Sequence, residues 1–67
     1  MKISYEPLFE LINERELKQK TVWRKAHLSG SSCQKLRNNE NVTTDILVRL
    51  CTALDCELSQ IVKVVKE

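Results

Sequence analysis

Residues 19–37 read QKTVWRKAHLSGSSCQKLR. Val22 and Ala26 lie four residues apart, the spacing of one helix face, and they predict a helix over about Gln19–Ala26. A turn is expected at His27–Ser29, where the apolar helical spacing stops. This stretch therefore predicts a short helix that ends in a tight turn.

A second helix is predicted directly after the turn. The hydroxyl of Ser29 can accept a hydrogen bond from a free backbone N–H, so Ser29 suits the N-cap of a helix over about Gly30–Asn38. Cys33 and Leu36 form the inward face of this helix. A polar stripe lies on its opposite side and consists of Ser31, Gln34, Lys35 and Asn38.

Three further helices complete the predicted fold. The first runs over about Pro7–Arg15, because proline suits the first helical position and apolar residues recur at helical spacing. Another begins at Thr43 or Thr44, with Asp45 in its first turn and within reach of Arg49. The last is expected over about Leu58–Val64. The result is an all-α, compact five-helix fold in a single domain spanning residues 1–67, with the helix-turn-helix over about 19–38.

The two ends of the chain allow a second interpretation. Ile3 and Tyr5 alternate with polar residues, and Val62–Val65 is rich in β-branched residues. Both patterns are typical of strands, so the termini could instead form a small antiparallel pair.

The charge is distributed unevenly along the chain. The formal net charge is +2, but residues 15–37 hold seven basic residues and one acidic residue, a formal charge of +6, and the remainder carries −4. A separation of this kind favours a polyanionic partner, and double-stranded DNA is the first candidate.

The residues predict no metal site, disulfide or catalytic centre. Cys33, Cys51 and Cys56 form no C-x-x-C pair and, with a single histidine, match no zinc spacing. We expect them to be reduced thiols in or near the core. Since no Ser-His-Asp set, paired carboxylates beside a base or glycine-rich phosphate loop is present, we expect neither an enzyme nor a cofactor.

Apolar runs in the chain are short. None approaches the roughly 18 residues that a membrane-spanning helix needs, and no signal-peptide pattern is present. We therefore expect a cytoplasmic protein without a membrane partner. A chain of 67 residues buries only about 60% of the surface that its unfolded form exposes, so dimerisation would add stability.

The pattern resembles the lambda-repressor-like, Cro/CI-type (XRE) helix-turn-helix family of small five-helix DNA-binding domains. The resemblance covers about Tyr5–Ile61 and is carried by VWRKAHLSGSSCQKLRNNENVTTDILVRLCTALDCELSQI. Val22, the turn at His27–Ser29, Cys33 and Leu36 match the repeated features of the family. The segment NVTTDILVRLCTALDC is similar to very small stand-alone bacterial and phage regulators.

Four positions depart from the family pattern. Family members carry a small residue where Trp23 stands, so the tryptophan is expected to lie outward or to push the helices apart. Glycine is usual at His27 and common at Asn39, and both residues are expected to adopt the left-handed conformation. Lys18 replaces the usual serine or threonine cap and cannot accept a hydrogen bond.

The resemblance implies which residues contact DNA. The second helix of the motif would enter the major groove, where Lys35 can donate to guanine and Gln34 can pair with adenine. The base-reading set is Gly30, Ser31, Ser32, Gln34 and Lys35, in which Gly30 acts by letting the backbone come close. The phosphate-binding set is Lys18, Gln19, Lys20, Arg24, Arg37, Asn39 and Asn41.

Two functions follow from these residues. The first is a sequence-specific DNA-binding transcriptional regulator, a repressor that acts as a homodimer on a two-fold related operator. The alternative is a protein-binding module, such as an antitoxin or accessory factor, that uses the same fold. The apolar run Ile61–Val65 favours the alternative as a partner surface.

Overall fold

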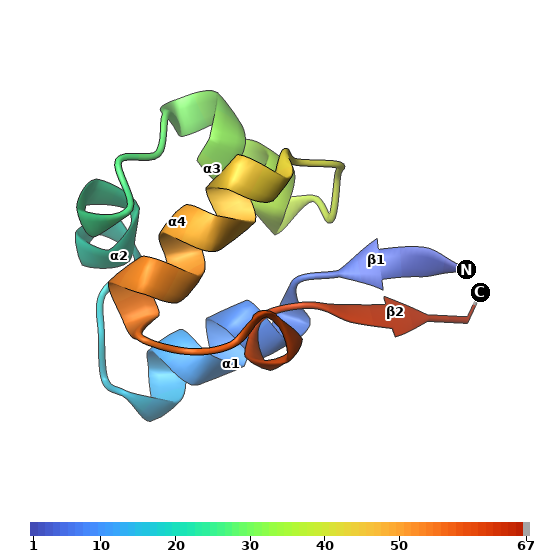
Figure 1. Cartoon of the computed structure of the whole chain (residues 1–67), viewed down its shortest axis with the longest axis horizontal. Coiled ribbons are helices and arrows are strands. Elements are labelled where there is room, and N and C mark those ends of the chain that lie inside the picture. The colour runs from blue at the N-terminus through green and yellow to red at the C-terminus, as the bar shows by residue number, and fades with distance from the viewer. Residues whose placement is uncertain (67) are drawn as a thin grey trace.

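The structure is a computed structural model that describes residues 1–66, so Glu67, the last residue of the predicted domain, lies outside the described residues. Four α-helices make up its body (Figure 1): α1 (Glu6–Glu14), α2 (Gln19–Lys25), α3 (Gly30–Arg37) and α4 (Thr44–Leu54). The remaining elements are a 3₁₀ helix, η1 (Leu58–Gln60), and two strands, β1 (Lys2–Ser4) and β2 (Lys63–Val65). The predicted starts of α2, α3 and α4 are confirmed, and α1 begins one residue early.

The five-helix, all-α prediction is wrong at the C-terminus. The described residues hold four α-helices, and the predicted fifth helix is only η1, which ends at Gln60. The chain then becomes extended and pairs with its own N-terminus, with Ile3 opposite Val64 in antiparallel register. The alternative interpretation, a terminal antiparallel pair, is therefore confirmed.

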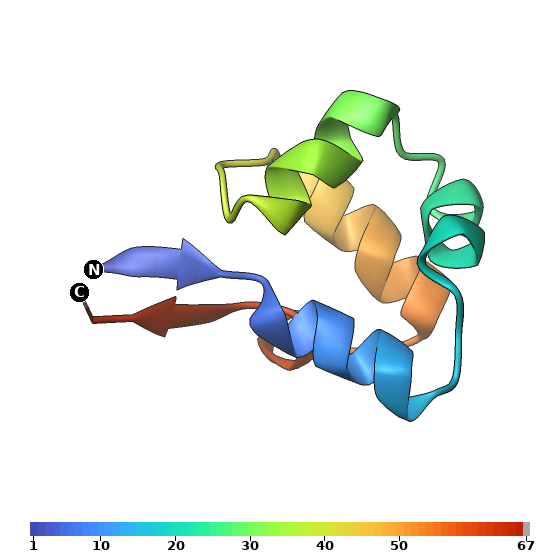
Figure 2. The ribbon, with the colours of Figure 1, turned by 180° about the vertical axis from the view of Figure 1, so that it is seen from behind.

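Local preference and strand pairing explain why the chain is not helical after Gln60. A seven-residue helix is marginal in water, and β-branched valines favour an extended backbone. Pairing with β1 satisfies backbone groups along one edge of Lys63–Val65. Figures 1 and 2 show β1 and β2 side by side in a sheet that projects from the helical body.

A single cluster of buried residues holds the elements together. Burial of one large aliphatic side chain contributes about 1.5–3 kcal/mol, so these contacts account for much of the stability. Ile61 is fully buried here, so the C-terminal apolar run is partly used inside the fold. The fully buried side chains are Tyr5, Leu8, Ile12, Leu36, Leu50, Leu54 and Ile61.

All four α-helices end in the same way. A residue with φ between 50° and 57° follows each helix, and the next N–H donates to a carbonyl five residues earlier, which is the Schellman motif. The left-handed residues are Glu16, His27, Asn39 and Asp55. The predicted left-handed conformation is thus confirmed for His27 and Asn39, and glycine occupies none of the four positions.

Candidate nucleic-acid interface

The inward faces of α2 and α3 pack into the core as predicted. Val22 of α2 and Ala26, the C-cap of α2, are 2% exposed, and Cys33 and Leu36 of α3 are 6% and 0% exposed. Because α3 is anchored from behind by Cys33 and Leu36, its opposite face is left on the surface.

Trp23 lies inward, so the first of the two predicted alternatives, an outward side chain, is excluded. Its side chain is 7% exposed, and its ring meets the ring of Phe9 edge to face, with centroids 6.1 Å apart and planes at 80°. An edge-to-face pair is a favoured arrangement of aromatic rings. The tryptophan is accommodated by this contact with α1 and is a packing residue.

The turn between α2 and α3 is held from two sides. The His27 N–H donates to Arg24 O at 3.1 Å and the Leu28 N–H to Trp23 O at 3.0 Å, which closes the end of α2. From α4, Arg49 Nη1 donates to the His27 carbonyl at 3.3 Å, and Arg49 Nη2 forms an ion pair with Asp45 Oδ2 at 2.9 Å. The predicted Asp45–Arg49 pair is confirmed, but the contact with the turn was not predicted because 22 residues separate the two positions.

Serine hydroxyls organise the start of α3. Ser29 is the N-cap and its Oγ accepts from the Ser32 N–H at 3.3 Å, as predicted. The hydroxyls of Ser31 and Ser32 lie 3.2 Å and 3.1 Å from the same oxygen. Ser32 is half-buried, so its hydroxyl belongs to the cap more than to the open face.

The rest of the predicted base-reading set lies together on the exposed face of α3: Gly30, Ser31, Gln34 and Lys35. A Cβ built on Gly30 would meet no atom within 4 Å, so the packing of the protein does not require glycine there. The space in front of Gly30 is open to a molecule that approaches from outside.

The predicted phosphate-binding residues form two groups on either side of α3. The first extends along α2 from its N-cap, Lys18, to its last turn, and Lys18 provides no side-chain cap, as predicted. It consists of Lys18, Gln19, Lys20 and Arg24, all exposed. The second group lies at the end of α3 and in the following loop, and consists of Arg37, Asn39 and Asn41, also exposed.

Asn39 has a structural role that the sequence did not indicate. Its Oδ1 accepts from the Tyr5 N–H at 3.0 Å, and the Tyr5 hydroxyl donates to the Glu40 carbonyl at 2.8 Å. Tyr5 is 1% exposed, and this burial raises the pKa of its hydroxyl. These contacts tie the loop after α3 to the residue between β1 and α1, and the amide nitrogen of Asn39, the donor that a phosphate would need, takes no part in them.

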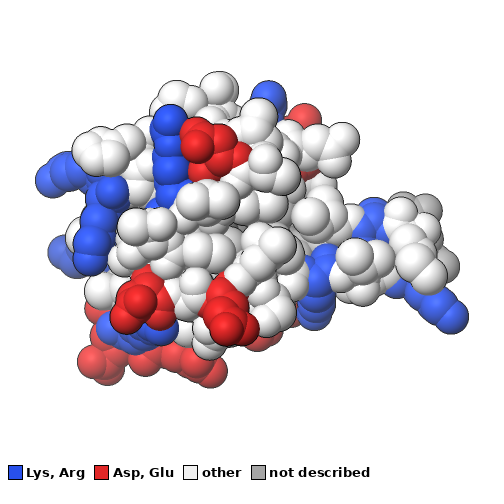
Figure 3. Space-filling view, viewed as in Figure 1, with Lys and Arg blue, Asp and Glu red and all other residues white. Residues whose placement is uncertain are grey.

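Basic and acidic side chains separate on the surface. Figure 3 shows blue side chains at the edge occupied by α2 in Figure 1, and red side chains along the edge occupied by α1. The acidic residues of α1 are Glu6, Glu10 and Glu14. A second basic region, which the order of residues along the chain does not indicate, forms beside the paired strands and contains Lys2, Lys63 and Lys66. Lys63 also forms an ion pair with Glu6 at 3.5 Å.

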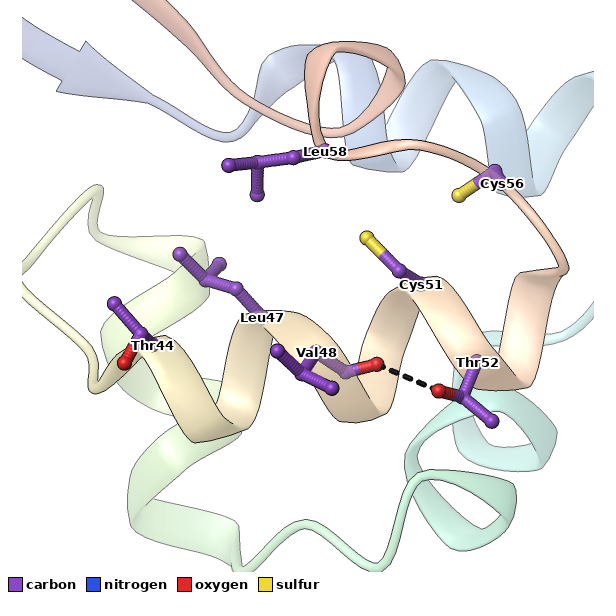
Figure 4. Close-up of a pocket in the computed structure, with 7 residues that line it drawn as sticks. All are labelled: Thr44, Leu47, Val48, Cys51, Thr52, Cys56 and Leu58. Carbon is purple, nitrogen blue, oxygen red and sulfur yellow. Dashed lines mark hydrogen bonds between the residues drawn. The ribbon is translucent and has the colours of Figure 1, made fainter.

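An uncharged groove of about 310 Å³ lies between α4 and η1 (Figure 4). Val48 and Leu58 are 61% and 49% exposed on its rim. Its lining residues are Thr44, Leu47, Val48, Cys51, Thr52, Cys56 and Leu58. Within residues 1–66, His, Cys, Asp and Glu side chains form no group of three that could hold a metal ion. No helix in that range has the length and apolarity to cross a membrane.

Comparisons with known proteins identify the family. No curated protein matches the sequence. Residues 8–67 match the family described as the Cro/C1-type HTH DNA-binding domain. Among solved structures, the crystal structure of transcriptional regulator VanUg, form II, has a TM-score of 0.93 at 30% sequence identity, with coverage of 98% of this chain and 88% of that chain. A family match over nearly the whole chain, on a fold with an exposed α3 beside a basic α2, shows that the chain belongs to the Cro/C1-type helix-turn-helix DNA-binding family.

Proposed function

We propose that this DNA-binding protein is a transcriptional repressor that acts as a homodimer on a two-fold related operator, with α3 in the major groove. The observation that carries this proposal is the face of α3 described above. Gln34 and Lys35 are exposed there, while Cys33 and Leu36 hold the helix from the other side. The similarity to the transcriptional regulator VanUg supports the regulatory role.

Base reading is assigned to the exposed N-terminal part of α3. Lys35 can donate to O6 and N7 of guanine, and the Gln34 amide can form paired hydrogen bonds with adenine. Among residues 1–66, Lys35 forms no ion pair that would compete with a base. We assign Ser32 mainly to the cap of α3, and Gly30 to close approach of the DNA backbone.

Phosphate binding is assigned to the two groups that flank α3. Lys18, Lys20 and Arg24 lie at the α2 side, and Arg37 and Asn41 lie at the other side. Contacts to phosphates on both sides would set the orientation of α3 without selecting a sequence. Asn39 can contribute through its amide nitrogen, because phosphate oxygens accept hydrogen bonds and that nitrogen is the donor of the side chain.

A dimer is proposed because one copy offers few base contacts. Specific protein–DNA complexes bury about 1,000–2,500 Å² of protein surface, and single small modules fall below that range. Two copies related by a two-fold axis would place their α3 helices about one helical turn apart on the duplex, roughly 34–36 Å. The operator is therefore expected to contain two inverted half-sites.

Selection of bound sequences from a random duplex pool tests this proposal. The expected result is an enriched palindromic sequence whose half-sites are one helical turn apart. Lys35→Ala should weaken binding to that sequence by about 1–3 kcal/mol and relax one base position in each half-site. A pool that shows no enrichment over random duplex would contradict sequence-specific binding, and enrichment of a single half-site would contradict the dimer.

Binding of a protein partner is a second candidate role, favoured by the groove between α4 and η1. The exposed side chains of Val48 and Leu58 make its rim apolar, and its lining has no charged residue. In Figure 4, α2 and α3 lie across α4 from the groove, so a partner there would leave α3 free for DNA. A stoichiometric complex that Val48→Lys abolishes, with unchanged DNA affinity of that variant, would support this role; DNA affinity that falls with Val48→Lys would contradict it.

A further inference from the structure

The end of α4 brings Cys51 and Cys56 into contact. The Cys56 N–H donates to the Cys51 carbonyl at 3.0 Å, across a left-handed Asp55 with φ of 50°. Both side chains line the groove between α4 and η1. Figure 4 shows both sulfur atoms in the space between α4 and the segment that leads to η1.

This contact is a consequence of how the helix ends. In a Schellman motif, the residue two positions past the helix packs against the residue whose carbonyl it binds. At α1 and α2 these pairs are Ile12 with Leu17 and Trp23 with Leu28, which are apolar. At α4 both positions of the motif are cysteine, so the backbone that closes the helix also aligns two thiols.

The pair differs from the third cysteine in access and in neighbours. Cys51 and Cys56 are half-buried and line the open groove, whereas Cys33 is 6% exposed in α3. A reagent that enters the groove therefore meets both thiols of the pair together. Reactive thiols are those that are accessible as thiolates, so access separates the pair from Cys33.

We propose that Cys51 and Cys56 form a dithiol modification site that an oxidant of the peroxide class closes into a disulfide. One thiolate attacks a peroxide oxygen, the O–O bond breaks, and a sulfenic acid forms as one water is released after proton uptake. The second thiol then attacks the sulfenic sulfur, an S–S bond forms and a second water leaves. The peroxide gains the two electrons that the two thiols lose.

The environment of Cys56 determines how the oxidation depends on pH. Burial raises the pKa of the Cys56 thiol, and so does the neighbouring Cys51 thiol, so the reaction should accelerate as the pH rises above neutrality. Closure would join the last turn of α4 to the segment before η1 and remove two thiols from the groove lining. No residue of α3 takes part, so the inference is independent of the proposed DNA contacts.

Mass spectrometry of the folded full chain after treatment with hydrogen peroxide tests the site. Trypsin releases both cysteines in one peptide, Leu50–Lys63, and Cys33 in another, Ala26–Lys35. We expect the first peptide to lose the mass of two hydrogen atoms while Cys33 stays free to alkylation. Cleavage of this peptide before Asp55 should then yield two fragments that the disulfide holds together until a reductant is added.

Variants show whether the pairing is specific. Cys33→Ser should keep the mass loss, and Cys51→Ser and Cys56→Ser should each abolish it, while circular dichroism confirms that all three fold. The oxidised wild type should melt at a higher temperature, because a cross-link restricts the unfolded chain. Linkage through Cys33, disulfides only between chains, or a lower melting temperature after closure would overturn the proposal.

Discussion

The salt dependence of DNA binding offers a quantitative check on the phosphate contacts, with Lys20→Ala as the perturbation. Four exposed cations belong to the proposed phosphate set, and among residues 1–66 none of them pairs with an acidic side chain: Lys18, Lys20, Arg24 and Arg37. Each phosphate neutralised adds about −0.9 to the slope of log affinity against log salt. Four contacts therefore predict a slope of about −3.6 for one protomer and about −7 for a dimer.

These slopes translate into measurable affinities. Raising the salt concentration from about 50 to about 200 mM should weaken the dimer complex roughly 10⁴-fold. Lys20→Ala removes one contact from each protomer, so the slope should change to about −5.4, and the variant should lose affinity for all duplexes alike. Fluorescence anisotropy with the selected operator and with a random duplex, over a series of salt concentrations, measures both effects.

A matched variant on the opposite surface is the control. Glu10 is exposed on α1, among the acidic residues, so Glu10→Gln changes the net charge by one unit without removing a phosphate contact. Its slope should equal that of the wild type. An unchanged slope for Lys20→Ala, or an equal change for Glu10→Gln, would refute the assignment of α2 to the DNA backbone.

Four other predictions follow from individual residues. Gly30→Ala should stabilise the fold by up to about 1 kcal/mol, because no atom meets the new methyl group, yet weaken DNA binding; equal affinity in an anisotropy titration would exclude close approach of DNA at this point. His27→Gly should stabilise the folded protein by about 1 kcal/mol through relief of left-handed backbone strain, and the more flexible unfolded chain should offset part of that gain. A melting temperature below that of the wild type would contradict this prediction. Leu36→Ala should cost about 2–5 kcal/mol, a large part of the roughly 3–10 kcal/mol expected for a chain of this length, and urea unfolding with a loss below about 1 kcal/mol would show that the site is not tightly packed. Tyr5→Phe removes the hydrogen bond to Glu40 and should cost about 1 kcal/mol. Because burial raises the pKa of Tyr5, the stability linked to its neutral form should be full below about pH 10 and fall as the pH rises through the raised value; melting curves in which the phenylalanine variant shows the same decline would contradict this cause.

The helix-turn-helix segment was predictable from sequence because its determinants are local. Ser29 and Thr43 cap α3 and α4 through bonds to N–H groups three residues away, and both caps are present in the structure. The inward position of Leu36 follows from helical spacing alone. Each of these contacts lies within one or two helical turns, so the pattern of neighbouring residues is enough to predict it.

The C-terminus was predicted wrongly because a distant partner decides its conformation. The spacing of apolar residues over Leu58–Val64 predicts a helix, but the helical conformation ends with η1. It ends there because Lys63–Val65 pairs with β1, some 60 residues earlier in the chain. Local propensity is a weak determinant where tertiary contacts compete with it. The strand character of the valines was visible in the sequence, but the choice between helix and strand was not.

The candidate nucleic-acid interface was also predictable from the sequence only in part. Its charge and the residues on the exposed face of α3 could be listed from the sequence, since both depend on residue type and helical spacing. The inward Trp23, the bond from Arg49 to the turn and the use of Asn39 by Tyr5 could not, because each joins residues that are at least 14 positions apart.

The amino-acid sequence by itself determined where the helices of the motif begin, which faces they bury and where positive charge gathers, since hydrogen bonds and side-chain spacing within a few residues control these features. Only the tertiary structure decided that Lys63–Val65 forms a strand, that the tryptophan packs against Phe9, and that an open groove lies beside Cys51 and Cys56. Those outcomes depend on which surfaces remain free once the four helices have packed, and no single segment of the chain contains that information.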